Sequence, residues 1–127
     1  MASIPPEAED HLTSELLVAH LATSRDDRPH AAPVWYVYRD GAIEIATTGT
    51  KLANIRANPR VALSIQKVEA GDPLWGMTIR GTATVVESES DGINRRLNEK
   101  YGADEDAWTE NTGVRIDVGS VDHWTYD

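Results

Sequence analysis

The 127-residue chain has a formal net charge of −9 and 40% hydrophobic residues, which predicts one globular domain spanning residues 1–127. The negative charge disfavours binding to nucleic acid or anionic membranes, and the absence of cysteine excludes disulfides and thiolate chemistry. The first residues lack the basic and apolar pattern of a secretion signal, and no run of about 20 apolar residues predicts a membrane span. We therefore expect a cytoplasmic, acidic protein.

Hydrophobic spacing and turn signals predict short elements in the first half of the chain. A helix is expected over 7–18, where leucines recur at helical spacing. Strands are expected over 19–24, 30–39 and 42–47, followed by a helix over 50–57. The hairpin signal Asp40-Gly41 would pair the second strand with the third, and Asn58-Pro59 would end the second helix.

The second half is expected to contain further strands and one exposed helix. The strands would cover 60–66, 76–87, 114–118 and 123–126, the helix 88–101, and the loops 68–74 and 102–110. Gly81 lies inside the longest strand, at a kind of position where a barrel strand often bends or bulges. About six short strands with few helices between them predict a mainly β protein built as an antiparallel barrel.

The sequence contains no pattern of a self-contained catalytic site. Its four histidines are not at metal-ligand spacing and no clustered Asp/Glu motif is present, so no metal site is expected. It also has no Gly-x-Ser-x-Gly elbow, no Walker loop and no Gly-x-Gly-x-x-Gly fingerprint. Hydrolase chemistry is therefore not expected, and the protein would either bind a ligand or use the chemistry of a cofactor.

The segment 45–51, Ile-Ala-Thr-Thr-Gly-Thr-Lys, has the features of a phosphate site. A strand ends there, the chain turns at the glycine, and a helix follows with Thr50 as its expected N-cap. The hydroxyls of Thr47, Thr48 and Thr50, free backbone N–H groups and Lys51 would then surround one point. The positive end of the helix dipole favours an anion at such a point. The alternative is that Thr50 only caps the helix and Lys51 is solvated.

An aromatic segment, Pro33 to Tyr38, would lie beside this phosphate candidate. It contains Trp35 and Tyr36, and the Asp40-Gly41 hairpin would pair its strand with the strand that ends at Thr47. An aromatic heterocycle with a phosphate tail would match both segments. Alternatively, Trp35 or Tyr36 is simply part of the hydrophobic core.

Several short motifs in a fixed order carry a family resemblance. They are Pro33-Val34-Trp35-Tyr36, Asp40-Gly41, Thr47-Thr48 with Lys51, Asn54-Ile55, Asn58 to Ala62, Ile79 to Ala83, and Val114 to Val118 followed by Trp124. In this order and spacing they resemble the pyridoxamine-phosphate-oxidase-like split-barrel flavoproteins, over about residues 16–124. The resemblance implies a split β-barrel that forms a homodimer with two FMN sites at the subunit interface.

The resemblance also implies a set of cofactor-binding residues. They are Val34, Trp35 and Tyr36 along the flavin ring and Thr47, Thr48 and Lys51 at the phosphate. Arg80 and Trp124 match positions from which the partner subunit completes the pocket, and Trp75 is a further candidate. No catalytic acid or base is assigned, and Tyr36 and His30 are the candidate proton donors.

The function implied is that of an oxidoreductase in which FMN transfers hydride or electrons to an unidentified small substrate. The alternatives on the same fold are a reductase that uses the deazaflavin coenzyme F(420), a non-enzymatic flavin-binding protein and a haem-binding or haem-degrading protein. A ligand-free interaction module also stays open. The chain has Thr50 where family members often carry arginine or serine, and it lacks the C-terminal arginine-rich segment of the true oxidases. Oxidation of vitamin B6 is therefore not expected.

Overall fold

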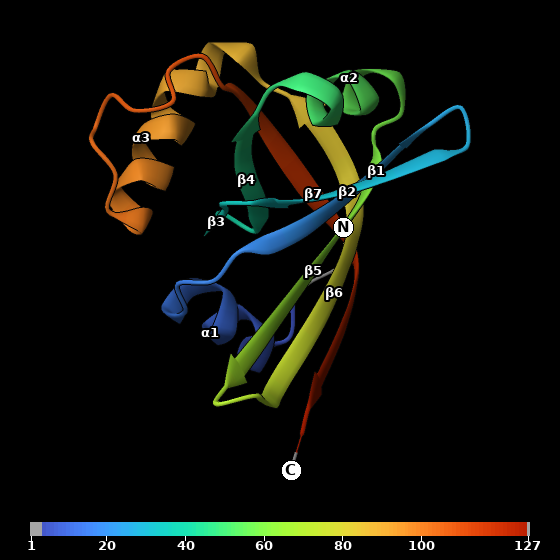
Figure 1. The fold of residues 1–127 in the computed structure, drawn as a ribbon, viewed down its shortest axis with the longest axis vertical. Helices are drawn as coiled ribbons and strands as arrows, with labels where there is room; N and C mark the ends of the chain where they lie inside the picture. Colours follow the sequence, from blue (N-terminus) through green and yellow to red (C-terminus); the bar gives the residue numbers. More distant parts are fainter. Residues whose placement is uncertain (1–3, 127) are drawn as a thin grey trace.

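One antiparallel sheet of seven strands dominates the computed structural model, which describes residues 4–126 (Figure 1). The strands are β1 (Ala19–Arg25), β2 (Arg28–Val34), β3 (Val37–Arg39), β4 (Ala42–Thr47), β5 (Arg60–Glu69), β6 (Asp72–Val85) and β7 (Thr112–Thr125). The helices are α1 (Pro6–Ser14), α2 (Gly49–Ala57) and α3 (Ser90–Tyr101), with the short 3-10 helix η1 (Glu87–Glu89) before α3. The predicted mainly β class is confirmed.

The order of the strands explains why the sheet curls into a split barrel. The order is β2-β1-β5-β6-β7-β4-β3, so β2 and β3 form its two edges. Yet only Trp35 and Tyr36 lie between these two strands in the chain. A two-residue link can join opposite edges only if the sheet bends round to bring them together.

The inside of the curled sheet holds the hydrophobic core. Inward-facing residues alternate with exposed ones along β1, as expected for a strand with one buried face. Core residues from six of the strands include Leu21, Val34, Ile45, Leu63, Ile79 and Ile116. The helix α1 adds Ala8 and Leu12, both fully buried. The helix α3 contacts β4 and β7 and buries Ile93 and Leu97.

The end of α3 supports the link between the two edge strands. The Tyr36 backbone N–H donates to the hydroxyl oxygen of Tyr101 (3.3 Å), and that hydroxyl donates to the carbonyl oxygen of Leu17 (2.6 Å). Lys100 Nζ donates to the carbonyl oxygen of Tyr36 (2.8 Å). These bonds satisfy backbone groups at a corner where the strand ladder is interrupted.

The structure corrects the predicted strand 30–39. The segment forms two strands, and β2 pairs with β1 while β3 pairs with β4 across the Asp40-Gly41 hairpin. The alternation of residue types could not reveal the break, because the contacts that hold Trp35 and Tyr36 come from the distant end of α3.

Other predicted boundaries also change. The first helix ends at Ser14 rather than at residue 18, and Leu16 in the following segment is 63% exposed. The predicted loop 68–74 is instead a hairpin between β5 and β6, whose turn residues Ala70 and Gly71 have positive φ. The two predicted C-terminal strands are parts of the single strand β7. The bulge expected near Gly81 is confirmed by a register shift between Arg80 and Gly81.

The two predicted helices around the candidate site need smaller corrections. The helix α2 begins at Gly49, so Thr48 rather than Thr50 is its N-cap. The helix α3 is not simply exposed, because one face buries Ile93, Asn94, Leu97 and Asn98. Among residues 4–126, no helix combines the length and hydropathy needed to cross a membrane.

A buried carboxylate lies on β4 within this framework. Glu44 is 1% exposed, and its Oε atoms lie 3.2, 2.9 and 3.6 Å from guanidinium nitrogens of Arg39, Arg96 and Arg115. The arginines come from β3, α3 and β7, so one carboxylate connects three elements. Such a charge needs its partners, because an uncompensated buried charge is strongly destabilising.

Candidate functional site

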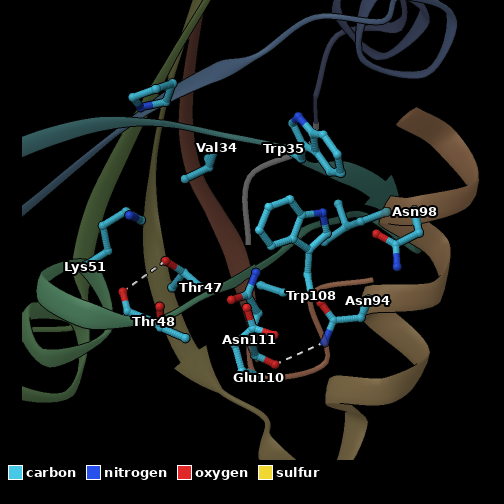
Figure 2. Close-up of a pocket in the computed structure, with 13 residues that line it drawn as sticks. Val34, Trp35, Thr47, Thr48, Lys51, Asn94, Asn98, Trp108, Glu110 and Asn111 are labelled. Carbon is cyan, nitrogen blue, oxygen red and sulfur yellow. Dashed lines mark hydrogen bonds between the residues drawn. The ribbon is translucent and has the colours of Figure 1, made fainter. Parts of the chain in front are cut away.

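The main cavity, with a volume of about 450 Å³, lies between the ends of β2 and β4, the start of α2, and α3 with its following loop (Figure 2). Its lining residues are Pro33, Val34, Trp35, Ala46, Thr47, Thr48, Lys51, Asn94, Leu97, Asn98, Trp108, Glu110 and Asn111. Five of the nine predicted cofactor residues are thus brought together in one place. This volume is within the range of small-molecule and cofactor sites.

One end of the main cavity is suited to an anion. The helix α2 begins there, has no side-chain cap hydrogen bond, and carries no acidic residue in its first turn. Its first N–H groups therefore keep unused donors at the positive end of the helix dipole. Lys51 forms no ion pair within residues 4–126. Thr47 and Thr48 stand beside it (Figure 2).

The other end of the main cavity is aromatic. The Trp35 ring stacks on Tyr101, with centroids 4.7 Å apart and planes 5° apart. Trp108 approaches Trp35 edge-on, with centroids 6.4 Å apart and planes at 89°. The Trp108 backbone has a φ of 61°, which is uncommon for a large residue, and the residue is 52% exposed. An aromatic ring entering the cavity would therefore meet apolar surface here.

Two buried amides on α3 hold the wall that carries Trp108. Asn94 Nδ2 donates to the carbonyl oxygen of Asn111 (3.0 Å). Asn98 Nδ2 donates to the carbonyl oxygens of Glu105 (3.2 Å) and Ala107 (2.9 Å). The residues at 94 and 98 are 5% and 1% exposed, so the amides fix the 102–111 loop against the cavity.

The sequence analysis did not predict that α3 and the loop after it line the main cavity. A usable signal was present, because Asn94 and Asn98 lie four residues apart, on the same helical face as the apolar Ile93 and Leu97. Polar residues on a buried face need partners. Nothing in the sequence, however, indicates that the loop would bring Trp108 next to Trp35.

Comparisons with known proteins identify the family. A sequence model of the pyridoxamine 5'-phosphate oxidase family matches residues 4–125. The chain belongs to this family. Among curated proteins, no sequence gives a significant match.

Solved structures with the fold of this oxidase family align over nearly the whole chain. A conserved hypothetical protein, Rv2991 from Mycobacterium tuberculosis, is 25% identical with a TM-score of 0.81, covering 96% of this chain and 85% of its own. A structure named F420 reductase is 24% identical with a TM-score of 0.77, covering 93% and 98%. A FAD-binding protein from Mycobacterium smegmatis is 24% identical with a TM-score of 0.68, covering 98% of each chain. These likenesses show a shared split-barrel fold.

In this member of the pyridoxamine 5'-phosphate oxidase family, Tyr36 lies in the core rather than in the main cavity. It is fully buried, and its hydroxyl oxygen has no hydrogen-bond partner among the described residues. Burial raises the pKa of Tyr36, with further contributions from Tyr101 and Glu15. The Tyr36 hydroxyl is therefore less acidic than usual and is separated from a ligand in the cavity.

The remaining predicted residues lie away from the main cavity of the same chain. Trp75 is 5% exposed and stacks on His11, with centroids 4.2 Å apart. Arg80 pairs with Asp122 at 3.2 Å. Trp124 is 40% exposed and donates from Nε1 to the Tyr126 hydroxyl (3.0 Å). Of the three, Trp75 has the least surface left for a ligand.

The part of the chain from 4 to 126 contains no group of three or more His, Cys, Asp or Glu side chains that could hold a metal ion. Among the lining residues of the main cavity, the acidic or basic side chains are Lys51 and Glu110. The site is therefore better equipped to bind an anion beside an aromatic group than to perform acid–base chemistry by itself.

Proposed function

We propose that the protein binds a flavin-type cofactor, FMN, in the main cavity and serves as an oxidoreductase for a small substrate. The observation that carries the proposal is the combination, in one cavity, of the uncapped start of α2 with Lys51 at one end and the Trp35–Trp108 aromatic wall at the other. A phosphate and an aromatic ring joined by a short chain match these two ends. The family membership and the structure with the same fold that is named a FAD-binding protein support a flavin-type cofactor.

Each part of the cavity has a role in this proposal. Lys51 and the first N–H groups of α2 neutralise and bind the phosphate. The Thr48 hydroxyl adds a donor, whereas Thr47 Oγ1 donates to the carbonyl oxygen of Thr48 (3.4 Å). Val34 and Trp35 offer apolar surface to the ring, while the loop held by Asn94 and Asn98 keeps water away from it. When bound, the flavin supplies the redox chemistry, taking up and giving back hydride.

A second candidate uses the deazaflavin coenzyme F(420) in the same cavity. It shares the ring-and-phosphate plan, and one structure with this fold is named F420 reductase. A non-enzymatic flavin-binding protein is the third candidate, because within residues 4–126 Lys51 and Glu110 are the only acidic or basic side chains that line the main cavity.

The cofactor itself is tested by the absorbance spectrum of the purified protein. Maxima at about 370 and 450 nm support a flavin. A single maximum at about 420 nm supports the deazaflavin, and an intense Soret band supports haem instead. A colourless protein that binds none of these after addition would contradict the proposed function.

The placement of the phosphate is tested by Lys51→Ala. Loss of one charge-assisted contact, worth about 1.5–3 kcal/mol, should weaken FMN binding roughly ten- to a hundredfold. Riboflavin lacks the phosphate, so its dissociation constant should hardly change. Lys67→Ala is a matched control, because Lys67 pairs with Glu15 outside the cavity. Equal FMN affinity in Lys51→Ala and the parent would mean that Lys51 is solvated and does not contact the phosphate.

The protein is also proposed to act as a homodimer. Trp124 and Tyr126 are 40% and 49% exposed, and Leu74 is 38% exposed near them on the paired ends of β6 and β7. A second copy of the chain that covers this surface would bury aromatic area. In such a dimer, Arg80 and Trp124 of one subunit could reach the main cavity of the other. Light scattering at micromolar concentration should therefore give twice the chain mass. A value near 14.0 kDa with cofactor bound would contradict the dimer.

A further inference from the structure

A second cavity lies on the other side of the start of α2. Its volume is also about 450 Å³, and we call it the hairpin cavity because the β1–β2 hairpin forms one wall. It is lined by Arg25, Asp26, Arg28, Pro29, His30, Thr50 and Asn54. Figure 1 shows the hairpin projecting beside α2. None of the nine predicted cofactor residues lines this cavity, but the candidate proton donor His30 does, away from the main cavity.

The two cavities meet at the same backbone elements. Thr50 lines the hairpin cavity and the next residue, Lys51, lines the main cavity, so both open onto the first turn of α2. On β2, His30 lines the hairpin cavity and Val34 lines the main cavity. These residues are four apart on one face of the strand, a separation of about 13 Å. Ala32 lies between them on the same face of the strand.

The hairpin cavity is locally cationic in a chain of net charge −9. Arg28 has no ion-pair partner in the described part of the chain. Arg25 has only an exposed contact of 3.9 Å with Asp26. The His30 Nδ1 atom is buried and has no hydrogen-bond partner within residues 4–126. Unpaired cations around one space favour an anionic ligand.

We propose that the hairpin cavity is an anion subsite for the part of a cofactor that extends beyond its first phosphate. The proposal rests on the proposed function, because the first phosphate must sit at Lys51 for the extension to reach Arg28. The ligand class is a flavin-type cofactor with an anionic tail, either a second phosphate, as in FAD, or carboxylates, as in coenzyme F(420). FMN ends at its phosphate and would leave this subsite unused. With the subsite in use, the cofactor is a longer relative of FMN that carries the same flavin-type ring and first phosphate.

The test compares three ligands by calorimetry: FMN, FAD and coenzyme F(420). The parent protein should bind FAD or F(420) about tenfold more tightly than FMN. Arg28→Gln should raise the dissociation constant of that longer ligand about three- to tenfold and leave FMN unchanged. Arg95→Gln removes the same charge from α3, outside both cavities, and is the matched control. Arg25→Gln, with far-UV circular dichroism, gives a second variant in case Arg28→Gln disturbs the hairpin.

The outcomes separate this proposal from the proposed function. If only FAD binds more tightly than FMN, the subsite binds a second phosphate. If only F(420) binds more tightly than FMN, the subsite binds carboxylates. If FMN binding depends on Lys51 but neither FAD nor F(420) binds more tightly than FMN, the proposed subsite is wrong and the proposed function stands. If Arg28→Gln weakens the binding of all three ligands equally, the Arg28 charge attracts any anionic ligand and the proposed subsite is also wrong. If none of the three binds, the proposed function itself fails.

Discussion

Lys100 Nζ lies 3.9 Å from the centre of the Tyr36 ring and 2.8 Å from the carbonyl oxygen of the same residue. The ammonium group thus contacts both the aromatic face and the backbone at the corner between β2 and β3. Burial lowers the pKa of Lys100 from 10.5 to about 8. The attraction to the ring and to the carbonyl oxygen favours the charged form, and burial disfavours it more.

This relationship predicts a stability that rises with pH. Between the folded pKa of about 8 and the unfolded value of 10.5, the unfolded state binds more protons at Lys100 than the folded state. The free energy of unfolding therefore increases with pH in this window. Above about pH 10 the raised pKa values of Tyr36 and Tyr101 act in the opposite direction, since the folded state then holds protons that the unfolded state loses.

Urea unfolding from pH 7 to 9.5 measures the effect. After allowance for the partial exposure of Lys100, the rise should be about 1 kcal/mol. Lys100→Met should flatten the profile, whatever its effect on stability at pH 7, and Lys67→Met should keep the rise. A parent profile that is flat or falls between pH 8 and 9.5 would show that Lys100 is not held in this environment.

Replacing the buried carboxylate should destabilise the fold. Glu44→Gln keeps the shape of the side chain but leaves Arg39, Arg96 and Arg115 without their shared counter-charge. Because the arginines are partly solvated, we expect a loss of about 2–4 kcal/mol in the free energy of unfolding. The urea midpoint should fall without a change in slope. Glu69→Gln, at a side chain that is 65% exposed, should change stability by less than about 0.5 kcal/mol.

Gly81 is required by the close approach of β6 and β7. A Cβ at this position would overlap the backbone oxygen of Asp117 and lie 2.9 Å from a methyl group of Ile116. Gly81→Ala should therefore lower the free energy of unfolding by about 2 kcal/mol or more. Gly92→Ala is the matched comparison, since a Cβ there lies 3.4 Å from the flexible end of Arg96, and a helical alanine should stabilise by about 0.5 kcal/mol. Equal thermal midpoints for the two variants would contradict this account of the bulge.

Trp108 should determine how well the main cavity retains its ligand. Trp108→Ala removes the edge-on contact with Trp35 and opens the loop side of the cavity to water. FMN should dissociate more readily, with an affinity loss of about three- to tenfold. Trp108→Phe should retain most of the affinity, because an aromatic edge remains. Binding that is unchanged in Trp108→Ala would mean that the ligand does not reach this wall.

The sequence was most informative where the determining contacts are local. The turn at Gly49 and the start of α2 beside Lys51 follow from neighbouring residues, and so does the Asp40-Gly41 hairpin. The division of 30–39 into two strands could not be predicted in this way, because the backbone of Tyr36 is held by residues 64 and 65 positions later. The same reasoning applies to Trp108, whose position depends on hydrogen bonds that the side-chain amides of Asn94 and Asn98 donate to a loop without regular structure.

The place of β7 in the sheet has a consequence for how the chain folds. The β1–β2, β3–β4 and β5–β6 hairpins can each form from neighbouring residues, but β7 pairs with both β6 and β4. Without it, β2-β1-β5-β6 and β4-β3 are two separate sheets. The barrel therefore cannot close until Thr112–Thr125 is available, and the loop-closure entropy of that late pairing should limit the folding rate. A fragment ending before residue 112 should collapse without acquiring either the sheet or its cavities.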